Sequence, residues 1–218
     1  ARRVAATASA PRALPVAQPA ERFVTGLVLA AGSSRRLGEP KQLLPYGSGT
    51  LLGHTLETAR ASGFDQLIVA LGGGSGEVRR RVDLQGTDLV ENPDYGEGCS
   101  SSIAAGLSAL DPRSDLLVLM LGDQPGVTPA TVRALIGGSG AGTMLAVCRY
   151  DDGRGHPLAF GRRLFAELGE LDGDKAVWKL MDRLAEQVVE VRVPGSIPPD
   201  VDTREDYEAI LAAAGSSP

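Results

Sequence analysis

Three basic residues follow an apolar run near the start of the chain, within the segment LAAGSSRRLGEPK (residues 29–41). Gly32 permits backbone angles that turn successive N–H groups toward one point, which makes a nest for anions. Arg35 and Lys41 would place cations around this nest and suit a triphosphate, whereas we expect Arg36 to be only solvated. A surface turn with solvated basic side chains explains this segment equally well when it is taken alone.

Carboxylates follow other apolar runs. Asp123 comes directly after LLVLML (116–121) and Gly122, where an oxygen ligand for Mg²⁺ would be well placed. The segment DVDT offers Asp200 or Asp202 as a second carboxylate. The alternatives are structural: Asp123 would cap a turn, and Asp202 or the following threonine would cap a helix.

Short apolar runs alternate with helical patterns, and this alternation must position these residues. The predicted strands are 26–30, 66–71, 88–91, 116–121, 144–150 and 188–193. Helices are predicted near 50–62, 76–82, 100–110, 129–137, 161–169, 174–185 and 203–213. Uninterrupted apolar strands are typical of sheets covered on both faces, so we predict an α/β fold with a doubly wound, mostly parallel open sheet. The loops after strands 26–30, 116–121, 144–150 and 188–193 should then meet at one edge, where such sheets bind ligands.

Composition narrows the class of protein. The chain of 218 residues has a net charge of −5, which argues against a nucleic-acid partner, and its apolar runs are too short for a membrane partner. Its two cysteines are far apart and favour neither a disulfide framework nor a zinc site. Residues 1–22 are rich in Ala, Pro and Arg and carry no signal-peptide pattern, so we expect a disordered extension before one domain at 23–218. A cytoplasmic location is the corresponding expectation.

Two common nucleotide motifs are absent. Neither Lys41 nor Lys175 completes a GxxxxGK[ST] P-loop, and GGGSGE (72–77) fails the dinucleotide pattern GxGxxG at Glu77. The sequence therefore speaks against an ordinary P-loop NTPase and against a standard dinucleotide-binding dehydrogenase.

The segment LAAGSSRRLGEPK closely resembles the signature LAAGxSxRxGxxK of the molybdopterin nucleotidyltransferases, the MobA/MocA-like family. SSSIAAGL (100–107), GDQP (122–125), GHP (155–157) and DVDT (200–203) follow in that family's order, and the resemblance covers about residues 24–211. It is nearest to the molybdenum cofactor cytidylyltransferases. It implies a Rossmann-like nucleotidyltransferase fold and Mg²⁺-dependent transfer of CMP from CTP to the phosphate of molybdopterin, with release of pyrophosphate. A molybdoenzyme would be a further partner.

The resemblance also implies roles for individual residues. The catalytic residues would be Arg35, Lys41 and Asp123, and the metal would be held by Asp123 and Asp202, with Asp200 as the alternative second ligand. The nucleotide would be bound by Leu29, Ala30, Ala31, Gly32, Ser33, Ser34, Arg35, Lys41, Ser101 and Gly122. The acceptor would be bound by Gly155, His156 and Lys175, although a histidine that only fixes its own turn is as good a reading of His156. We expect Trp178 to fill the core.

Two features bear on the choice of substrates. Guanylyltransferases of this fold usually have LAGG where this chain has LAAG, and the methyl group of Ala31 favours CTP over GTP by roughly 1–3 kcal/mol. Many relatives have Gly-Asp-x-Gly where this chain reads GDKA (173–176), which puts the choice of acceptor in doubt.

Three other functions stay open. They are GTP-dependent guanylyl transfer, an NAD(P)H-dependent oxidoreductase of the nicotine-blue type on the same fold, and a non-catalytic nucleotide-binding module. Release of pyrophosphate, oxidation of NADPH, and binding without turnover would distinguish transfer, reduction and a binding module, respectively.

Overall fold

One seven-stranded sheet organises the protein, in the order β5-β4-β1-β6-β8-β7-β9. The computed structural model describes residues 22–32, 34, 36–173 and 175–215. Its strands in this sheet are β1 (Val24–Ala30), β4 (Gln66–Leu71), β5 (Asp88–Glu91), β6 (Leu116–Leu121), β7 (Leu145–Arg149), β8 (Arg154–Gly161) and β9 (Val188–Arg192). All neighbouring pairs are parallel except those that include β8, which runs antiparallel to β6 and β7. The predicted mostly parallel α/β sheet is therefore confirmed.

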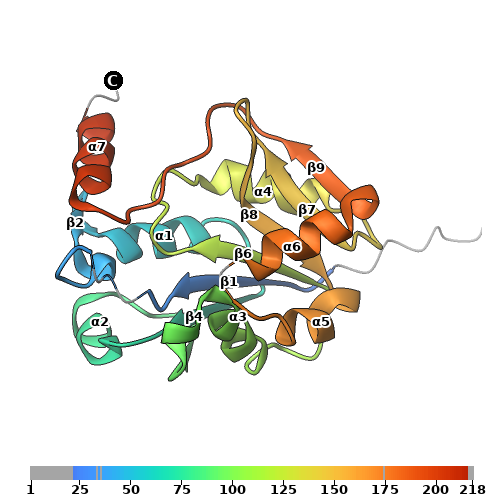
Figure 1. Ribbon diagram of the computed structural model, residues 1–218, viewed down its shortest axis with the longest axis horizontal. Coiled ribbons are helices and arrows are strands. Elements are labelled where there is room, and N and C mark those ends of the chain that lie inside the picture. Colours follow the sequence, from blue (N-terminus) through green and yellow to red (C-terminus); the bar gives the residue numbers. More distant parts are fainter. Residues whose placement is uncertain (1–21, 33, 35, 174, 216–218) are drawn as a thin grey trace, which may run out of the picture.

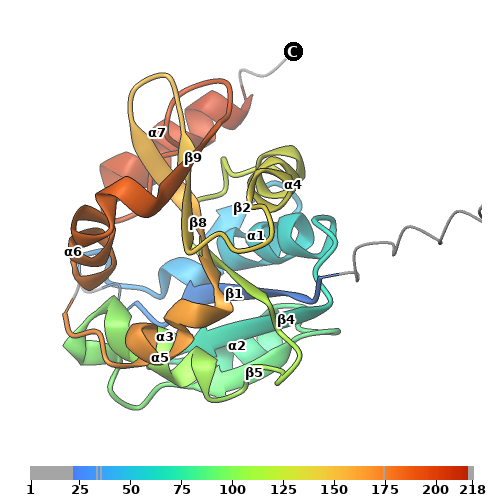
Figure 2. The same cartoon turned by 90° about the vertical axis from the view of Figure 1, so that its right-hand side faces the viewer.

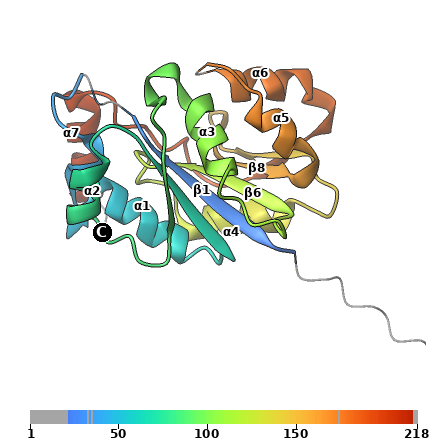
Figure 3. The ribbon, with the colours of Figure 1, turned by 90° about the horizontal axis from the view of Figure 1, so that it is seen from below.

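Helices cover both faces of this sheet (Figure 1, Figure 3). They are α1 (Leu51–Arg60), α2 (Ser75–Arg81), α3 (Cys99–Leu107), α4 (Pro129–Gly138), α5 (Phe165–Gly169), α6 (Ala176–Arg183) and α7 (Arg204–Gly215). Short 3₁₀ turns lie at Lys41–Leu43, Tyr95–Glu97, Arg162–Leu164 and Ala185–Gln187, and β2 (Pro45–Tyr46) pairs with β3 (Gly49–Thr50) in a small hairpin. None of the described helices combines the length and the apolarity needed to cross a membrane.

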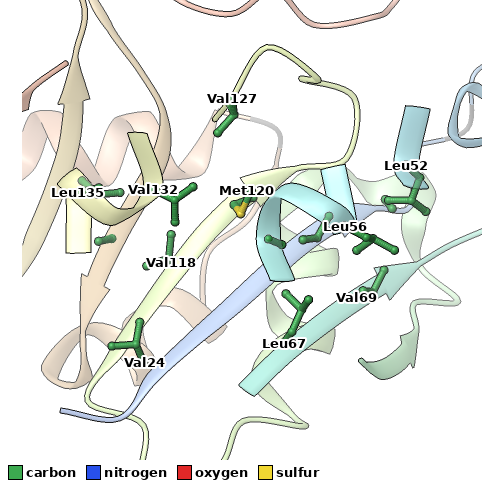
Figure 4. Close-up of a cluster of buried hydrophobic side chains, with 14 of the residues drawn as sticks. Val24, Leu52, Leu56, Leu67, Val69, Val118, Met120, Val127, Val132 and Leu135 are labelled. Atoms are coloured by element: carbon green, nitrogen blue, oxygen red, sulfur yellow. The ribbon is translucent and has the colours of Figure 1, made fainter. Parts of the chain in front are cut away.

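Side chains of each central strand alternate between two cores. In β6, Val118 and Met120 pack with Leu52 and Leu56 of α1 and with Val132 of α4 (Figure 4). The intervening leucines of β6 face the other core, with side chains from α3, α5 and α6. Figure 2 shows α6 and α4 on opposite sides of β8 and β9. Burial on both faces explains why these strands appear in the sequence as uninterrupted apolar runs.

Strand β8 is the main departure from the prediction. We expected the segment around GRGHP to be a loop after the strand at 144–150, whereas it begins a strand. A proline inside a strand removes a ladder hydrogen bond, so this strand needs a local irregularity. The register between β7 and β8 shifts here: Val147 pairs with Leu158, whereas Cys148 pairs with Gly155. Pro157 thus lies in a bulge, where the ladder needs no N–H donor.

The boundaries of the folded part also differ slightly from the prediction. Arg22, which we placed in the extension, donates hydrogen bonds to the carbonyl oxygens of Ile136 (2.8 Å) and Ser139. The rest of the predicted extension, residues 1–21, lies outside the described residues. Helix α7 packs beside β2, where Tyr207 Oη donates to the carbonyl of Pro45 (Figure 1). This contact holds the segment before α7 near the loop that follows β1.

Candidate active site

The loop after β1 is shaped by two polar side chains. Ser34 has a positive φ of 51°, and its hydroxyl accepts a hydrogen bond from the backbone N–H of Lys41 at 2.9 Å. The buried Gln42 donates from Nε2 to the carbonyl oxygens of Ala30 (2.7 Å) and Gly32 (3.1 Å). The positive φ angles of the described loop residues are those at Ser34 and Gly38, so Gly32 does not make the turn through such an angle.

Gly32 is needed for space. A Cβ atom at this position would lie 3.2 Å from Cε of Lys41, tighter than most real contacts. The lysine stem therefore lies directly against the loop backbone. This close approach brings the ammonium group from the loop to the carboxyl end of β6.

The ammonium of Lys41 lies among oxygen atoms from two separate segments. It contacts the carboxylate of Asp123 and lies 3.1 Å from Oδ1 of Asp202 and 3.0 Å from the carbonyl oxygen of Val201. Burial opposes the charged ammonium, but the two carboxylates outweigh it and raise the pKa of Lys41 above its usual value. Lys41 is therefore a permanent cation at the centre of the site near pH 7.

Asp202 is paired with cations on both of its oxygens. Its Oδ2 atom lies 2.9 Å from the guanidinium of Arg36, which we expected to be only solvated. Burial opposes the charged carboxylate, but Lys41 and Arg36 outweigh it and lower the pKa of Asp202. The cap of α7 is made by Thr203, whose hydroxyl accepts from the N–H of Asp206, so the side chain of Asp202 is available to face Lys41.

Asp200 is held by a different partner. Gln124, which is buried, donates from Nε2 to a carboxylate oxygen of Asp200 and to the carbonyl oxygen of Pro198 (3.0 Å). Burial, and then the negative charge of Asp123, raise the pKa of Asp200. Of the two candidates for a second metal ligand, Asp202 shares a cation with Asp123, whereas Asp200 is engaged by an amide.

The oxygen atoms around Lys41 fit a hard divalent cation. Asp123, Asp202 and the carbonyl of Val201 already surround one positive charge, and carboxylate and carbonyl oxygens are the ligands that Mg²⁺ prefers. In the part of the chain that the structure describes, no group of three His, Cys, Asp or Glu side chains has the arrangement of a metal site. A cation here would therefore take its remaining ligands from water or from a phosphate group.

A cavity of about 320 Å³ opens at the carboxyl ends of β1 and β6, and we call it the loop cavity. It is lined by Leu29, Ala30, Ala31, Gly32, Lys41, Gln42, Tyr95, Gly96, Gly98, Cys99, Ser102, Leu121, Gly122 and Asp123. Asn92 donates from Nδ2 to the hydroxyls of Ser101 and Ser102, both at 2.9 Å, and so fixes the start of α3 against this cavity. Backbone groups and small side chains thus form much of its wall.

A second cavity of about 420 Å³ adjoins the first, and we call it the Trp178 cavity. It is lined by Leu29, Lys41, Cys99, Leu119, Leu121, His156, Val177, Trp178, Asp200 and Asp202. The rings of His156 and Trp178 meet edge to face with their centres 5.7 Å apart. Burial lowers the pKa of His156 to about 4, so its imidazole is neutral near pH 7. Trp178, which we expected to fill the core, is partly buried against the core and also forms part of this cavity wall.

The two cavities share four lining residues: Leu29, Lys41, Cys99 and Leu121. Two ligands bound in them would meet beside Lys41, where Asp123 lines the loop cavity and Asp202 lines the Trp178 cavity. The arrangement can therefore hold two molecules against one cluster of charges.

The predicted site residues differ in where they lie. Those that line the loop cavity are Leu29, Ala30, Ala31, Gly32, Lys41, Gly122 and Asp123, and His156 and Asp202 line the Trp178 cavity. Ser34 and Ser101 support the walls through hydrogen bonds, whereas Gly155 and Lys175 are not among the lining residues of either cavity. Ser33 and Arg35 lie outside the described residues. The roles assigned to all of these residues stay predictions.

Sequence reasoning missed Gln42, Gln124 and the cavity role of Trp178. The two glutamines follow Lys41 and Asp123 directly, so their proximity to charged candidates was visible. Gln42 bonds to backbone carbonyls at the end of β1 and in the loop that follows it, and Gln124 bonds to a distant segment, and neither contact leaves a pattern in the sequence.

The chain was compared with known proteins. The sequence pattern of the MobA-like NTP transferase domain matches residues 26–188. Among solved structures, Rv0371c from Mycobacterium tuberculosis H37Rv is 51% identical, with 88% of this chain and 98% of that chain covered and a TM-score of 0.82. The same protein has a structure in complex with manganese, which is 49% identical, with 88% of this chain and 99% of that chain covered and a TM-score of 0.79. A nucleotidyl transferase from Methanothermobacter is 28% identical, with 88% and 97% covered and a TM-score of 0.75.

A curated relative has a different activity in its name. Nicotine blue oxidoreductase from Paenarthrobacter nicotinovorans is 39% identical over 114 residues, which are 52% of this chain and 55% of that protein. The chain thus matches about half the length of this relative. Together with the solved structures, the comparisons confirm the predicted nucleotidyltransferase fold.

Proposed function

The chain belongs to the MobA-like NTP transferase domain family, and on that premise we propose that it transfers CMP from CTP to the phosphate of molybdopterin with the help of Mg²⁺. Pyrophosphate is the second product. The observation that supports this proposal most is the meeting of two cavities at Lys41, with carboxylates on either side. A transferase needs two substrates side by side at a point where their negative charges are offset.

The nucleotide would occupy the loop cavity and the acceptor the Trp178 cavity. An oxygen of the acceptor phosphate attacks the α-phosphorus of CTP, and the bond between that phosphorus and the pyrophosphate oxygen breaks. The attacking oxygen is already ionised near pH 7, so the reaction needs no general base. Lys41 supplies positive charge at the meeting point and stabilises charge that develops on the leaving pyrophosphate.

Asp123 and Asp202 are the residues that would hold the divalent cation, and the manganese complex of the Mycobacterium tuberculosis relative agrees with a metal in this family. When bound, the cation would neutralise phosphate charge and act as a Lewis acid. The neutral imidazole of His156 would border the acceptor without adding charge.

The preference for CTP rests on Ala31. This residue is buried and is among the lining residues of the loop cavity, where a methyl group in place of glycine's hydrogen would narrow the space beside the backbone. A narrower pocket favours the single ring of cytosine over the two rings of guanine, by roughly 1–3 kcal/mol.

A panel of nucleotides tests the proposal. The protein is incubated with Mg²⁺, molybdopterin and CTP, GTP, ATP or UTP in turn, and released pyrophosphate is measured. We expect release with CTP, at a rate that Asp123→Asn lowers strongly and the exposed control Asp182→Asn does not. Absence of release with every nucleotide would contradict transfer to molybdopterin, and release with GTP alone would move the proposal to guanylyl transfer.

An oxidoreductase is the second candidate, favoured by the 39% identity with nicotine blue oxidoreductase. Hydride transfer to a flat organic dye would place the dye in the Trp178 cavity, against the aromatic wall. Oxidation of NADPH is followed by its absorbance in the presence of such a dye. Turnover there, without pyrophosphate release in the panel above, would favour this candidate.

A further inference from the structure

Lys41 makes three contacts with its ammonium group. They are with the carboxylates of Asp123 and Asp202 and with the carbonyl oxygen of Val201. An ammonium has three N–H donors and no acceptor, so these contacts account for all of them. The side chains of Lys41 and Asp123 are only 14% and 16% exposed, which limits how far water can replace these contacts.

The same oxygen atoms are the ligands that the proposed metal site would use. A divalent cation and the ammonium of Lys41 cannot both lie among them, because two positive charges would share one set of ligands at short range. In the arrangement seen here the protein's own cation takes that place. Metal binding therefore requires the ammonium group of Lys41 to move away from these oxygen atoms.

The surroundings of Lys41 allow the ammonium to move while its backbone stays in place. The backbone N–H is fixed by the hydroxyl of Ser34, and the stem lies against Gly32, which has no side chain to block it. Because Lys41 lines both cavities, a rotated side chain would still end in the loop cavity, where the triphosphate would lie.

We propose that Lys41 is an internal counter-cation that occupies the metal site of the nucleotide-free protein, and that metal and nucleotide therefore bind cooperatively. The metal takes the carboxylates, and the displaced ammonium pairs with phosphate oxygens. Each ligand favours the position of Lys41 that the other needs, so each raises the affinity for the other by the same factor. This inference rests on the metal and nucleotide sites of the proposed function. It explains in addition why the protein should bind the metal weakly when no nucleotide is present.

Titration with Mn²⁺, followed by the electron paramagnetic resonance signal of free Mn²⁺, tests the proposal without any turnover. In the nucleotide-free protein, Lys41→Met keeps an unbranched side chain, one atom shorter, and removes its charge. We expect this variant to bind Mn²⁺ about tenfold more tightly than wild type, within the range usual for coupled sites. Lys41→Arg, which keeps the charge, should bind Mn²⁺ weakly like wild type, and the exposed control Lys179→Met should not differ from wild type.

A folded Lys41→Met variant that binds Mn²⁺ no more tightly than wild type would overturn the proposal, since a purely structural lysine predicts that result. A second measurement uses the wild-type protein and does not depend on any variant folding. Acylation of Lys41 by an amine-reactive reagent, quantified by mass spectrometry, should rise when Mn²⁺ is added and fall when CTP follows. Unchanged labelling on addition of Mn²⁺ would also overturn the proposal. Failure of the pyrophosphate panel would leave both measurements unaffected, so the two proposals can fail separately.

Discussion

Gln42 offers the sharpest test of how the loop after β1 is held. Gln42→Met keeps an unbranched side chain of similar length and removes the amide donors. The carbonyl of Ala30, which belongs to a buried residue, loses its 2.7 Å hydrogen bond, and an unsatisfied buried acceptor costs about 1–3 kcal/mol. The carbonyl of Gly32 loses a 3.1 Å bond, but this residue is exposed and water can replace the donor at a cost of about 0.5 kcal/mol. We therefore expect the free energy of unfolding to fall by about 2 kcal/mol.

Urea unfolding followed by circular dichroism measures this change. Gln85→Met is the matched control, because Gln85 is exposed and the same substitution there should alter the free energy of unfolding by less than about 0.5 kcal/mol. We also expect Gln42→Met to weaken CTP binding in calorimetry, since the carbonyls it releases belong to the wall of the loop cavity. If the free energy of unfolding of Gln42→Met differs from the wild-type value by no more than about 0.5 kcal/mol, the size expected for the control, the loop does not depend on this side chain.

Three further predictions concern packing, pH and the acceptor. Gly106→Ala should lower the free energy of unfolding by about 1–3 kcal/mol in urea, because the new Cβ would lie 2.5 Å from Cδ1 of Leu27, whereas Gly137→Ala, with open space around it, should not destabilise. The pKa of His156 is about 4 in the folded protein against 6.5 for the free side chain, so wild type should lose stability as pH falls from about 6.5 to 4, by at most about 3 kcal/mol. His156→Gln should remove that part of the slope, and an unchanged pH profile of unfolding would count against the buried neutral imidazole. Under the proposed function, Trp178→Leu should raise KM for the acceptor severalfold and leave KM for CTP unchanged in steady-state assays, and an equal rise in both would place Trp178 outside the acceptor site.

The parallel part of the fold was predictable because its signal is local. Runs such as 67–71 and 116–121 are apolar at every position, and the structure places them between two helical layers. Strand β8 was missed because its pattern is broken by Pro157, and only the partner strand shows that the break is a bulge. The strand is thus encoded by pairing with β6 and β7 rather than by its own sequence.

The candidate site was predictable to the extent that the sheet dictates it. Loops that follow parallel strands end at one edge, so Lys41 and Asp123 were expected to be near each other, and they are in contact. The side chains that hold these groups were not predictable, because the amide of Gln124 reaches Asp200 across a long stretch of chain. The contact of Arg36 with Asp202 was not predictable either, because Asp202 lies directly before α7 and its position depends on where that helix packs.

The antiparallel strand β8 explains how one sheet edge can serve two ligands. Parallel strands bring only their carboxyl ends to this edge, whereas β8 brings its amino end there and with it His156. The loop cavity is built from the first part of the chain, through Asp123, and the Trp178 cavity adds residues from β8, α6 and the segment before α7. Under the proposed function, changes in these later elements would alter the second ligand while the nucleotide wall stays the same. Such a separation would let related chains on one fold have activities as different as those named for a nucleotidyl transferase and for nicotine blue oxidoreductase.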